Sequence, residues 1–410
     1  MKKVLLIGLG NKNPKNQFIL KQLKKMNLDF YFLKSYQDEN WFTDIIDKNH
    51  IFLTDVYNPT RAISDLSVII QKNNLKFDAI FTFDEHLVLQ TSVIAQFFGC
   101  IATPIETISA SSANKLTFRN KYNKICNKNL IKSAIEIIDN IEENTILSDK
   151  DLVIKPLFGN NSYGVKKIYA GKSNNIKQYV NQSWSTKQEE SYKNFNGVFL
   201  LEEYIKGTTF SVDGIVQNNV VLFAGINQFG YSPEPYFFQV SNTIPPVLDK
   251  IQQEKIYKTI SHSLKELKYN NTPFHAEIKY TDKKIYIIEI ACRAPGGQIM
   301  KGYEQAYGYN FVKQVINLYL GKPVSFIKKK NNHVLQKGVY IPQNCSIKDF
   351  YIPEQTPKCK EFVRILNKGD KNSYPISATP VYYYALTERN KDKIYVKSHK
   401  IENDIKITIS

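Results

Sequence analysis

Two apolar runs that each carry a single glutamate constrain this chain most. They lie in residues 274–297, FHAEIKYTDKKIYIIEIACRAPGG, on either side of the polar, turn-like segment 281–284. Both runs alternate residue types with the period of a strand, which predicts a β-hairpin. If the hairpin is centred near Lys283, Glu277 and Glu289 lie opposite each other on one face. Two like charges roughly 5 Å apart at Cβ destabilise a hairpin unless a cation lies between them. A divalent metal is the simplest such cation.

The residues after the second glutamate strengthen this interpretation. Arg293 follows on the same face as Glu289, and Pro295-Gly296-Gly297 then turns the chain tightly. Carboxylates, a guanidinium and glycine backbone amides together suit magnesium plus phosphate. The alternative is a pair of solvated glutamates on an open sheet face. The metal interpretation requires a nucleotide site elsewhere in the chain.

Composition narrows the function classes. The 410 residues are enough for two or three domains with substantial cores, and the formal net charge is +17. The lysines are scattered, and the longest basic run is only 328–330, so we expect no nucleic-acid partner and interpret the charge as favouring anionic small molecules. The five cysteines form no CxxC pair, which argues against disulfide or zinc frameworks and favours the reducing cytoplasm. No stretch approaches the ~20 apolar residues of a membrane span, so we expect no membrane partner.

The first 112 residues predict an α/β domain. Gly8-Leu9-Gly10 resembles the start of a dinucleotide fingerprint, but Asn13 replaces the third glycine and no acidic ribose ligand follows, which disfavours a nicotinamide site. We expect a ligand crevice at the strand ends instead. The expected strands are 4–9, 28–33 and 79–83, and the expected helices are 16–26 and 88–98.

The next segment supplies candidates for phosphate binding. A helix capped by Ser111, Ser112 or Asn114 carries Lys115, Arg119 and Lys121, for which a solvated basic helix is the alternative. The strand 151–156 places Lys155 among apolar residues, where a lysine needs an anionic partner or an edge position. A loop bounded by Gly159 and Gly164 follows and can bring its amides close to phosphate oxygens. It lacks the Lys and Ser or Thr of a Walker A loop.

Later segments predict the substrate side of the site. We expect strands at 198–205 and 209–216, where a plain hairpin with exposed glutamates is the alternative to an adenine-binding edge. The aromatic, proline-rich segment 227–246 suggests either a loop lining a substrate pocket or a rigid packing loop. Helices are expected at 249–267 and 310–320. The C-terminal part predicts a small β-rich subdomain with strands at 381–386, 393–398 and 405–410.

Taken in order, these motifs resemble the ATP-grasp superfamily, and His275 together with the 235–246 loop looks most like the L-amino acid ligases and related carboxylate-amine ligases. The likeness covers roughly residues 1–325. It implies an α/β and α+β multidomain ATP-grasp fold. The implied domains are a Rossmann-like preATP-grasp domain at 1–112, an ATP-grasp domain at 113–323 with a small lobe at about 125–200, and the C-terminal β-rich subdomain at 324–410.

The resemblance also implies roles for individual residues. ATP and Mg²⁺, with Mn²⁺ as an alternative, are the expected cofactors, Glu277 and Glu289 the metal ligands, and Arg293 and Lys155 the catalytic cations. Arg293, Gly296, Gly297 and Gln239 would contact the acid substrate. The nucleotide contacts implied are Lys115, Lys155, Gly159, Ser162, Tyr163 and Gly164 at the phosphates, and Glu202, Glu203, Tyr204 and Ile205 at the adenine.

Several residues depart from the family pattern. Ala291 occupies the usual place of an asparagine metal ligand, and the predicted register places it opposite His275. We therefore expect His275, a water or the substrate to fill that coordination position, and His275 is also a candidate general base or a structural histidine. Thr209 replaces a ribose-binding glutamate. Gln239 and Asn242 replace a Glu and a His of the substrate loop.

The expected reaction joins a small carboxylate to an amine through an acyl phosphate and releases ADP and phosphate. The alternatives are a carboxylase or carbamoyl-phosphate-type enzyme and a nucleotide-binding regulator without catalysis. The sequence leaves the oligomeric state open, with a homodimer as one option.

Overall fold

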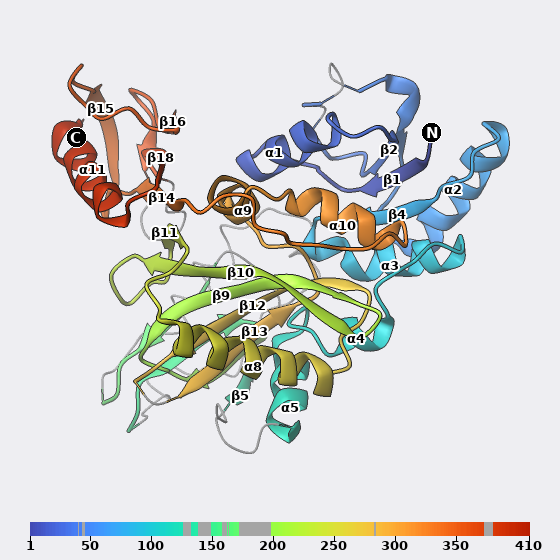
Figure 1. The fold of residues 1–410 in the computed structure, drawn as a ribbon, viewed down its shortest axis with the longest axis horizontal. Coiled ribbons are helices and arrows are strands. Elements are labelled where there is room, and N and C mark those ends of the chain that lie inside the picture. Colours follow the sequence, from blue (N-terminus) through green and yellow to red (C-terminus); the bar gives the residue numbers. More distant parts are fainter. Residues whose placement is uncertain are drawn as a thin grey trace.

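The chain is built from an N-terminal α/β unit, a central pair of sheets and a C-terminal β-rich unit (Figure 1). The computed structural model describes residues 1–39, 41–42, 46–125, 133–137, 149–157, 162, 164–171, 198–282, 284–372 and 380–410. Across these ranges no helix combines the length and the apolar character that a membrane crossing requires.

The N-terminal unit is a parallel four-stranded sheet in the order β3-β2-β1-β4. Val4 and Leu6 of β1 pack with Phe18 on one face, while Leu5 and Ile7 pack on the other, so both faces are buried. Such double burial explains the continuous apolar run in β1. The elements are β1 (Lys3–Ile7), α1 (Pro14–Leu23), β2 (Asp29–Lys34), β3 (Ile51–Leu53), α2 (Pro59–Lys72), β4 (Ala79–Thr82), α3 (Val88–Phe97) and α4 (Ile105–Ser109), with 3-10 turns η1 (Lys48–His50) and η2 (Glu85–Leu87).

A smaller antiparallel sheet follows α5 (Lys115–Ile125) and has the order β5-β8-β6-β7. Asn114 precedes α5, and its side chain accepts a hydrogen bond from the Thr117 amide, as its sequence position predicts. We call this sheet the small lobe. Its strands are β5 (Ser133–Ile137), β6 (Leu152–Pro156), β7 (Lys166–Ile168) and β8 (Val198–Glu203).

The large sheet has eight strands in the order β13-β12-β9-β10-β11-β14-β18-β16. Phe274, Ala276 and Ile278 of β12 face helix α8, whose capping box is formed by Asp249 and Gln252. His275 and Glu277 alternate with them and therefore lie on the opposite face. The elements are β9 (Thr208–Gln217), β10 (Val220–Tyr231), β11 (Gln239–Ile244), α8 (Lys250–Glu266), β12 (Thr272–Tyr280), β13 (Ile285–Ala291), α9 (Ile299–Tyr307), α10 (Phe311–Tyr319), β14 (His333–Val339), β16 (Glu361–Arg364) and β18 (Tyr382–Glu388).

The C-terminal unit adds a small sheet in the order β17-β15-β19 and the helix α11. Strands β14, β16 and β18 belong to the large sheet, so the C-terminal unit is continuous with it (Figure 1). The remaining elements are β15 (Cys345–Tyr351), β17 (Lys371–Asn372), α11 (Lys391–Asp404) and β19 (Lys406–Ile409).

Three sequence predictions of local structure are wrong. Residues 393–398 were expected as a strand but lie in α11, where Ile394, Ser398 and Ile401 are buried with helical spacing. Strands β8 and β9 do not form a hairpin, because β8 pairs within the small lobe and β9 pairs with β10 and β12. The segment 227–246 is largely strand, and only residues 232–238 connect β10 to β11.

Candidate functional site

The β12–β13 hairpin has the register that its sequence predicts. Glu277 pairs with Glu289, and His275 pairs with Ala291. The register shifts just after Glu277, towards the turn. Both glutamates line one pocket, which lies between the small lobe and the large sheet and encloses about 1340 Å³ including its open mouth. The hairpin therefore places two carboxylates together at a cavity.

Two lysines from other elements line the same pocket. Lys155 lies on β6 and is buried, and Lys115 is the first residue of α5. The Lys115 amide donates to the Leu157 carbonyl at 3.3 Å, which ties α5 to the end of β6. Burial lowers the pKa of Lys115, an effect that the nearby Glu289 carboxylate opposes. Both predicted phosphate-binding lysines thus reach the cavity that holds the carboxylate pair.

Lys155 has the anionic partner that its apolar strand requires. Glu202 on β8 pairs with Lys155 and also accepts from Arg119 Nε at 2.7 Å. Arg119 is only 1% exposed and also donates to the carbonyls of Ile287 (2.9 Å) and Ile288 (2.6 Å) on β13. Burial alone would raise the pKa of the Glu202 carboxyl, but the two cations outweigh it and lower the pKa to about 2. The alternative of a solvated basic helix is therefore wrong for Arg119, and the Glu202 side chain is a buried counter-ion.

The predicted adenine edge lines the pocket between the small lobe and the large sheet. Glu202 and Glu203 end β8, and Tyr204 and Ile205 follow it directly. The Tyr204 amide donates to the Asp151 carbonyl at 2.9 Å, so in this conformation it is engaged within the small lobe. In this conformation a main-chain N–H donor to adenine would have to come from another residue of this edge.

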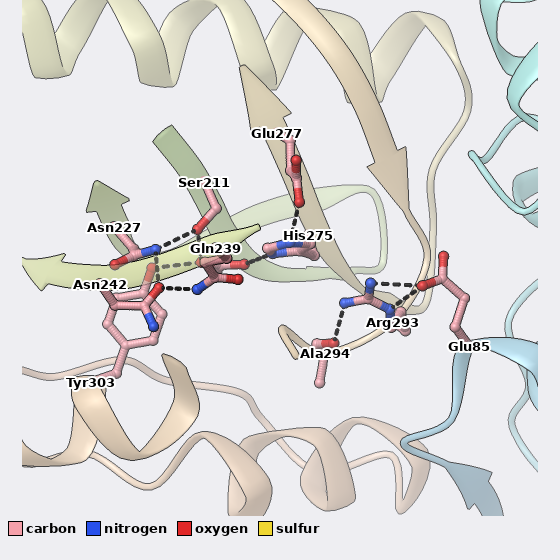
Figure 2. Close-up of polar contacts among 11 residues, drawn as sticks. Glu85, Ser211, Asn227, Gln239, Asn242, His275, Glu277, Arg293, Ala294 and Tyr303 are labelled. Carbon is pink, nitrogen blue, oxygen red and sulfur yellow. Dashed lines mark hydrogen bonds and ion pairs between the residues drawn. The ribbon is translucent and has the colours of Figure 1, made fainter. Parts of the chain in front are cut away.

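Arg293 connects the hairpin to the N-terminal unit (Figure 2). Its Nε and Nη2 both donate to one oxygen of Glu85, at 2.8 and 2.7 Å, and Nη1 donates to the Ala294 carbonyl. Burial alone would lower the pKa of Arg293, but Glu85 raises it. Gly296 and Gly297 follow at the pocket wall, and Gly297 has a left-handed φ of +53° that favours glycine. Glu85 follows strand β4, and the sequence analysis assigned it no role.

His275 lies between two carboxylates (Figure 2). Its Nδ1 is 2.6 Å from Asp213 and its Nε2 is 3.4 Å from Glu277. Asp213 is fully buried on β9 and also accepts from Tyr303 (2.7 Å) and Ser211 (3.0 Å). Burial alone would lower the pKa of His275, but Asp213 and Glu277 raise it to about 9. A protonated ring with both nitrogens engaged is suited to holding Glu277, more than to binding a metal or accepting a proton.

The two pocket glutamates differ in their surroundings. Burial favours the protonated form of both, but hydrogen bonding to His275 keeps the pKa of Glu277 low. The pKa of Glu289 is raised by burial and by the adjacent Glu277 carboxylate. Among the described residues no group of three or more His, Cys, Asp or Glu side chains is arranged to hold a metal ion. Two carboxylates nevertheless fit magnesium, which commonly takes one or two protein carboxylates and completes its shell with phosphate and water.

Of the remaining predicted site residues, Ser162 and Gln239 line the pocket. Gly164 has a positive φ of +65° in the loop after β6 and does not itself line the pocket, whereas the adjacent Val165 does. Gly159 and Tyr163 lie outside the described residues.

Sequence reasoning missed part of the pocket wall. Phe229 and Tyr231 of β10, Phe237 of the following loop and Lys279 of β12 all line the cavity. Lys279 lies over the rings of Tyr204 and Tyr231 at about 6 Å. The alternation Asn227, Phe229, Tyr231 would have indicated a strand face, but the glycines and prolines around it suggested an irregular loop.

Comparisons with known proteins test the family and the fold. Residues 148–301 match the family model of the ATP-grasp domain. This chain contains an ATP-grasp domain. A comparison with curated protein sequences returned no match.

Solved structures show the same fold over the whole chain. The L-amino acid ligase from Bacillus licheniformis superposes with a TM-score of 0.78 at 16% identity, covering 100% of this chain and 98% of that one. Phosphoribosylglycinamide synthetase from Anaerococcus prevotii gives 0.67 at 15% identity, covering 100% of both chains. Biotin carboxylase from Campylobacter jejuni gives 0.66 at 13% identity, covering 100% and 92%. The ATP-grasp fold expected from the sequence is therefore confirmed.

Proposed function

We propose that this protein is an ATP-dependent carboxylate-amine ligase that joins small amino-acid-like molecules. The observation that carries the proposal is the opposed pair Glu277 and Glu289, which shares one pocket with Lys115, Lys155 and Arg293. These groups come from α5, β6, β12, β13 and the turn after β13. Their convergence supports a site for a magnesium-bound nucleotide and an anionic acceptor. The structural likeness to an L-amino acid ligase adds support.

The nucleotide would lie between the small lobe and the large sheet. Lys115 and Lys155 would contact its phosphates, and the 203–205 edge would hold the adenine. Glu277 and Glu289 would hold magnesium, which when bound neutralises charge on the phosphates. Thr209 lines the same pocket, and its buried hydroxyl has no partner among the described residues, as expected of a group that contacts a ligand.

The chemistry then follows from charge and position. A substrate carboxylate oxygen attacks the γ-phosphorus of ATP, the bond to ADP breaks, and an acyl phosphate forms. The amine nitrogen next attacks the acyl carbon, phosphate leaves, and the amine loses a proton. Lys155 and Arg293 would stabilise the charge on the phosphoryl group. The bonds from Arg293 to Glu85 would orient its guanidinium for this role.

His275 fits a supporting role within this proposal. With Asp213 on one side and Glu277 on the other, it would orient the Glu277 carboxylate. The apolar Ala291 opposite it offers no metal ligand, so phosphate or water oxygens would complete the coordination. We also propose the domain boundaries 1–112, 113–323 and 324–410 for the preATP-grasp, ATP-grasp and C-terminal units.

A substrate screen tests the function. Pooled amino acids and small acids are supplied with ATP and Mg²⁺, phosphate release is measured, and products are identified by mass spectrometry. We expect release only when an acid and an amine are both present, with an amide or peptide as product. ATP turnover stimulated by bicarbonate alone would favour the carboxylase alternative. Nucleotide binding without ADP release in any mixture would favour a regulator.

A further inference from the structure

A cluster of charged and aromatic side chains joins the small lobe to residues 232–238 of the large sheet. Lys167 on β7 lies 2.9 Å from Glu234 in this loop and 2.8 Å from Asp151 just before β6. Tyr204, between the lobes, donates to the second Glu234 oxygen at 2.7 Å. We call Lys167, Glu234 and Tyr204 the latch.

The main chain makes the same connection. The Lys167 amide donates to the Pro235 carbonyl at 2.8 Å, and Lys166 forms an isolated antiparallel bridge with Tyr236. The loop closes on itself, because the Ser232 amide donates to the Phe238 carbonyl at 2.8 Å. The main chain of the loop thus contacts β7 beside the latch.

The latch is more than an exposed ion pair. A single solvated pair contributes little to stability. Here the Lys167 side chain is 8% exposed and is shared between two carboxylates. It also lies 4.2 Å from the centre of the Tyr204 ring. The hydrogen bond from the Lys167 amide to the Pro235 carbonyl also holds β7 against the loop.

The latched loop carries pocket residues. Phe237 lines the cavity and contacts the rings of Tyr204 and Tyr231, at centroid distances of 6.0 and 6.5 Å. Gln239 follows it at the start of β11. The small lobe supplies Val153, Lys155 and Pro156 to the other wall. The latch thus connects the small lobe to the pocket wall that holds Phe237.

We propose that the latch couples nucleotide binding by the small lobe to the placement of the 232–238 loop, so that Glu234 is a positioning residue for the second substrate. This inference rests on the proposed function, because it takes the nucleotide to lie against β6. Ordering of the loop by the first ligand makes binding of the second more favourable, and such couplings are typically about 5- to 150-fold in affinity.

Amide hydrogen exchange tests the coupling. Exchange is followed in residues 164–171 and 232–240, with and without Mg²⁺ and a non-hydrolysable ATP analogue. In the wild-type protein we expect the nucleotide to slow exchange in both segments. In Glu234→Gln the slowing should persist in 164–171 and disappear in 232–240, and Lys167→Gln should behave in the same way.

The matched control is Glu254→Gln, an exposed carboxylate on α8 that should retain protection of both segments. Thermal unfolding of each variant verifies that the fold is intact. Two results would overturn the coupling and leave the proposed function standing. In the first, nucleotide still slows exchange in 232–240 of Glu234→Gln. In the second, nucleotide slows exchange in 164–171 of the wild type but not in 232–240. A nucleotide that protects neither segment would overturn both.

Discussion

At the scale of single residues, the site depends on buried charges that neutralise one another. Arg293 would be a poorly oriented cation without Glu85, and Glu277 would be strongly destabilised without His275. Glu85 lies 208 positions away from Arg293, whereas His275 lies on the same strand as Glu277. The chemistry therefore relies on side chains that would not contact the substrate.

The Arg293–Glu85 pair gives the first prediction. Glu85→Gln removes the charge that orients Arg293, so we expect kcat to fall by about 100-fold, the effect of misplacing a reacting or stabilising group by ~1 Å. The KM for ATP should change little, because Glu85 lies on the N-terminal unit. Steady-state kinetics measure both. A variant with wild-type kcat would show that Arg293 needs no such support.

Glu202 gives a second prediction. Glu202→Gln leaves Lys155 and Arg119 buried without their counter-charge, so we expect a loss of about 3 kcal/mol in the free energy of unfolding at pH 7. Denaturant titration monitored by circular dichroism measures it. The exposed Glu254→Gln provides the control and should change stability by less than about 0.5 kcal/mol.

Glu202 also makes the free energy of unfolding depend on pH. The folded-state pKa of Glu202, about 2, lies below its usual value of 4.5, so its stabilisation is present above pH 4.5 and is lost as the pH falls towards 2. The stability difference between wild type and Glu202→Gln should therefore narrow across that window. A difference that stays constant from pH 5 to pH 2 would contradict the assignment.

At the scale of elements, helix α11 gives a prediction that distinguishes the observed helix from the strand expected at 393–398. In the helix Ile394 is buried and Val396 is 70% exposed, whereas a strand would place both on one face. We expect Ile394→Ala to cost about 2–5 kcal/mol and Val396→Ala less than about 0.5 kcal/mol. Denaturant titration of the two variants measures the contrast, and equal costs would contradict the helix.

Elements with local signals could be predicted, and those set by distant partners could not. The β12–β13 hairpin follows from strand alternation and a turn, so the Glu277–Glu289 register was correct. For α11 the apolar alternation of Ile394 and Val396 suggested a strand, whereas the structure shows a helix capped by Asn390, whose side chain accepts from two amides. Arg119 meets Glu202 from 83 positions away, and no local pattern reports such a pairing.

At the scale of the whole molecule, the pocket lies between two units and is supported by a third. The small lobe supplies Lys155, the large sheet supplies the hairpin, and Glu85 of the N-terminal unit binds the pocket residue Arg293. The resemblance to ATP-grasp enzymes fixed this architecture in advance, because several motifs occurred in the family order. The aromatic wall with Phe229 and Tyr231 was missed, since its position depends on how β10 pairs with β9 and β11.

The central claim is that the Glu277–Glu289 pair holds magnesium beneath a bound nucleotide. Calorimetric titration of a non-hydrolysable ATP analogue, with and without Mg²⁺, tests it on the wild type, Glu289→Gln and the control Glu254→Gln. We predict tight binding by the wild type and the control only with Mg²⁺, and loss of the magnesium-dependent part in Glu289→Gln. Equal affinity without magnesium, or unchanged magnesium dependence in Glu289→Gln, would contradict the claim.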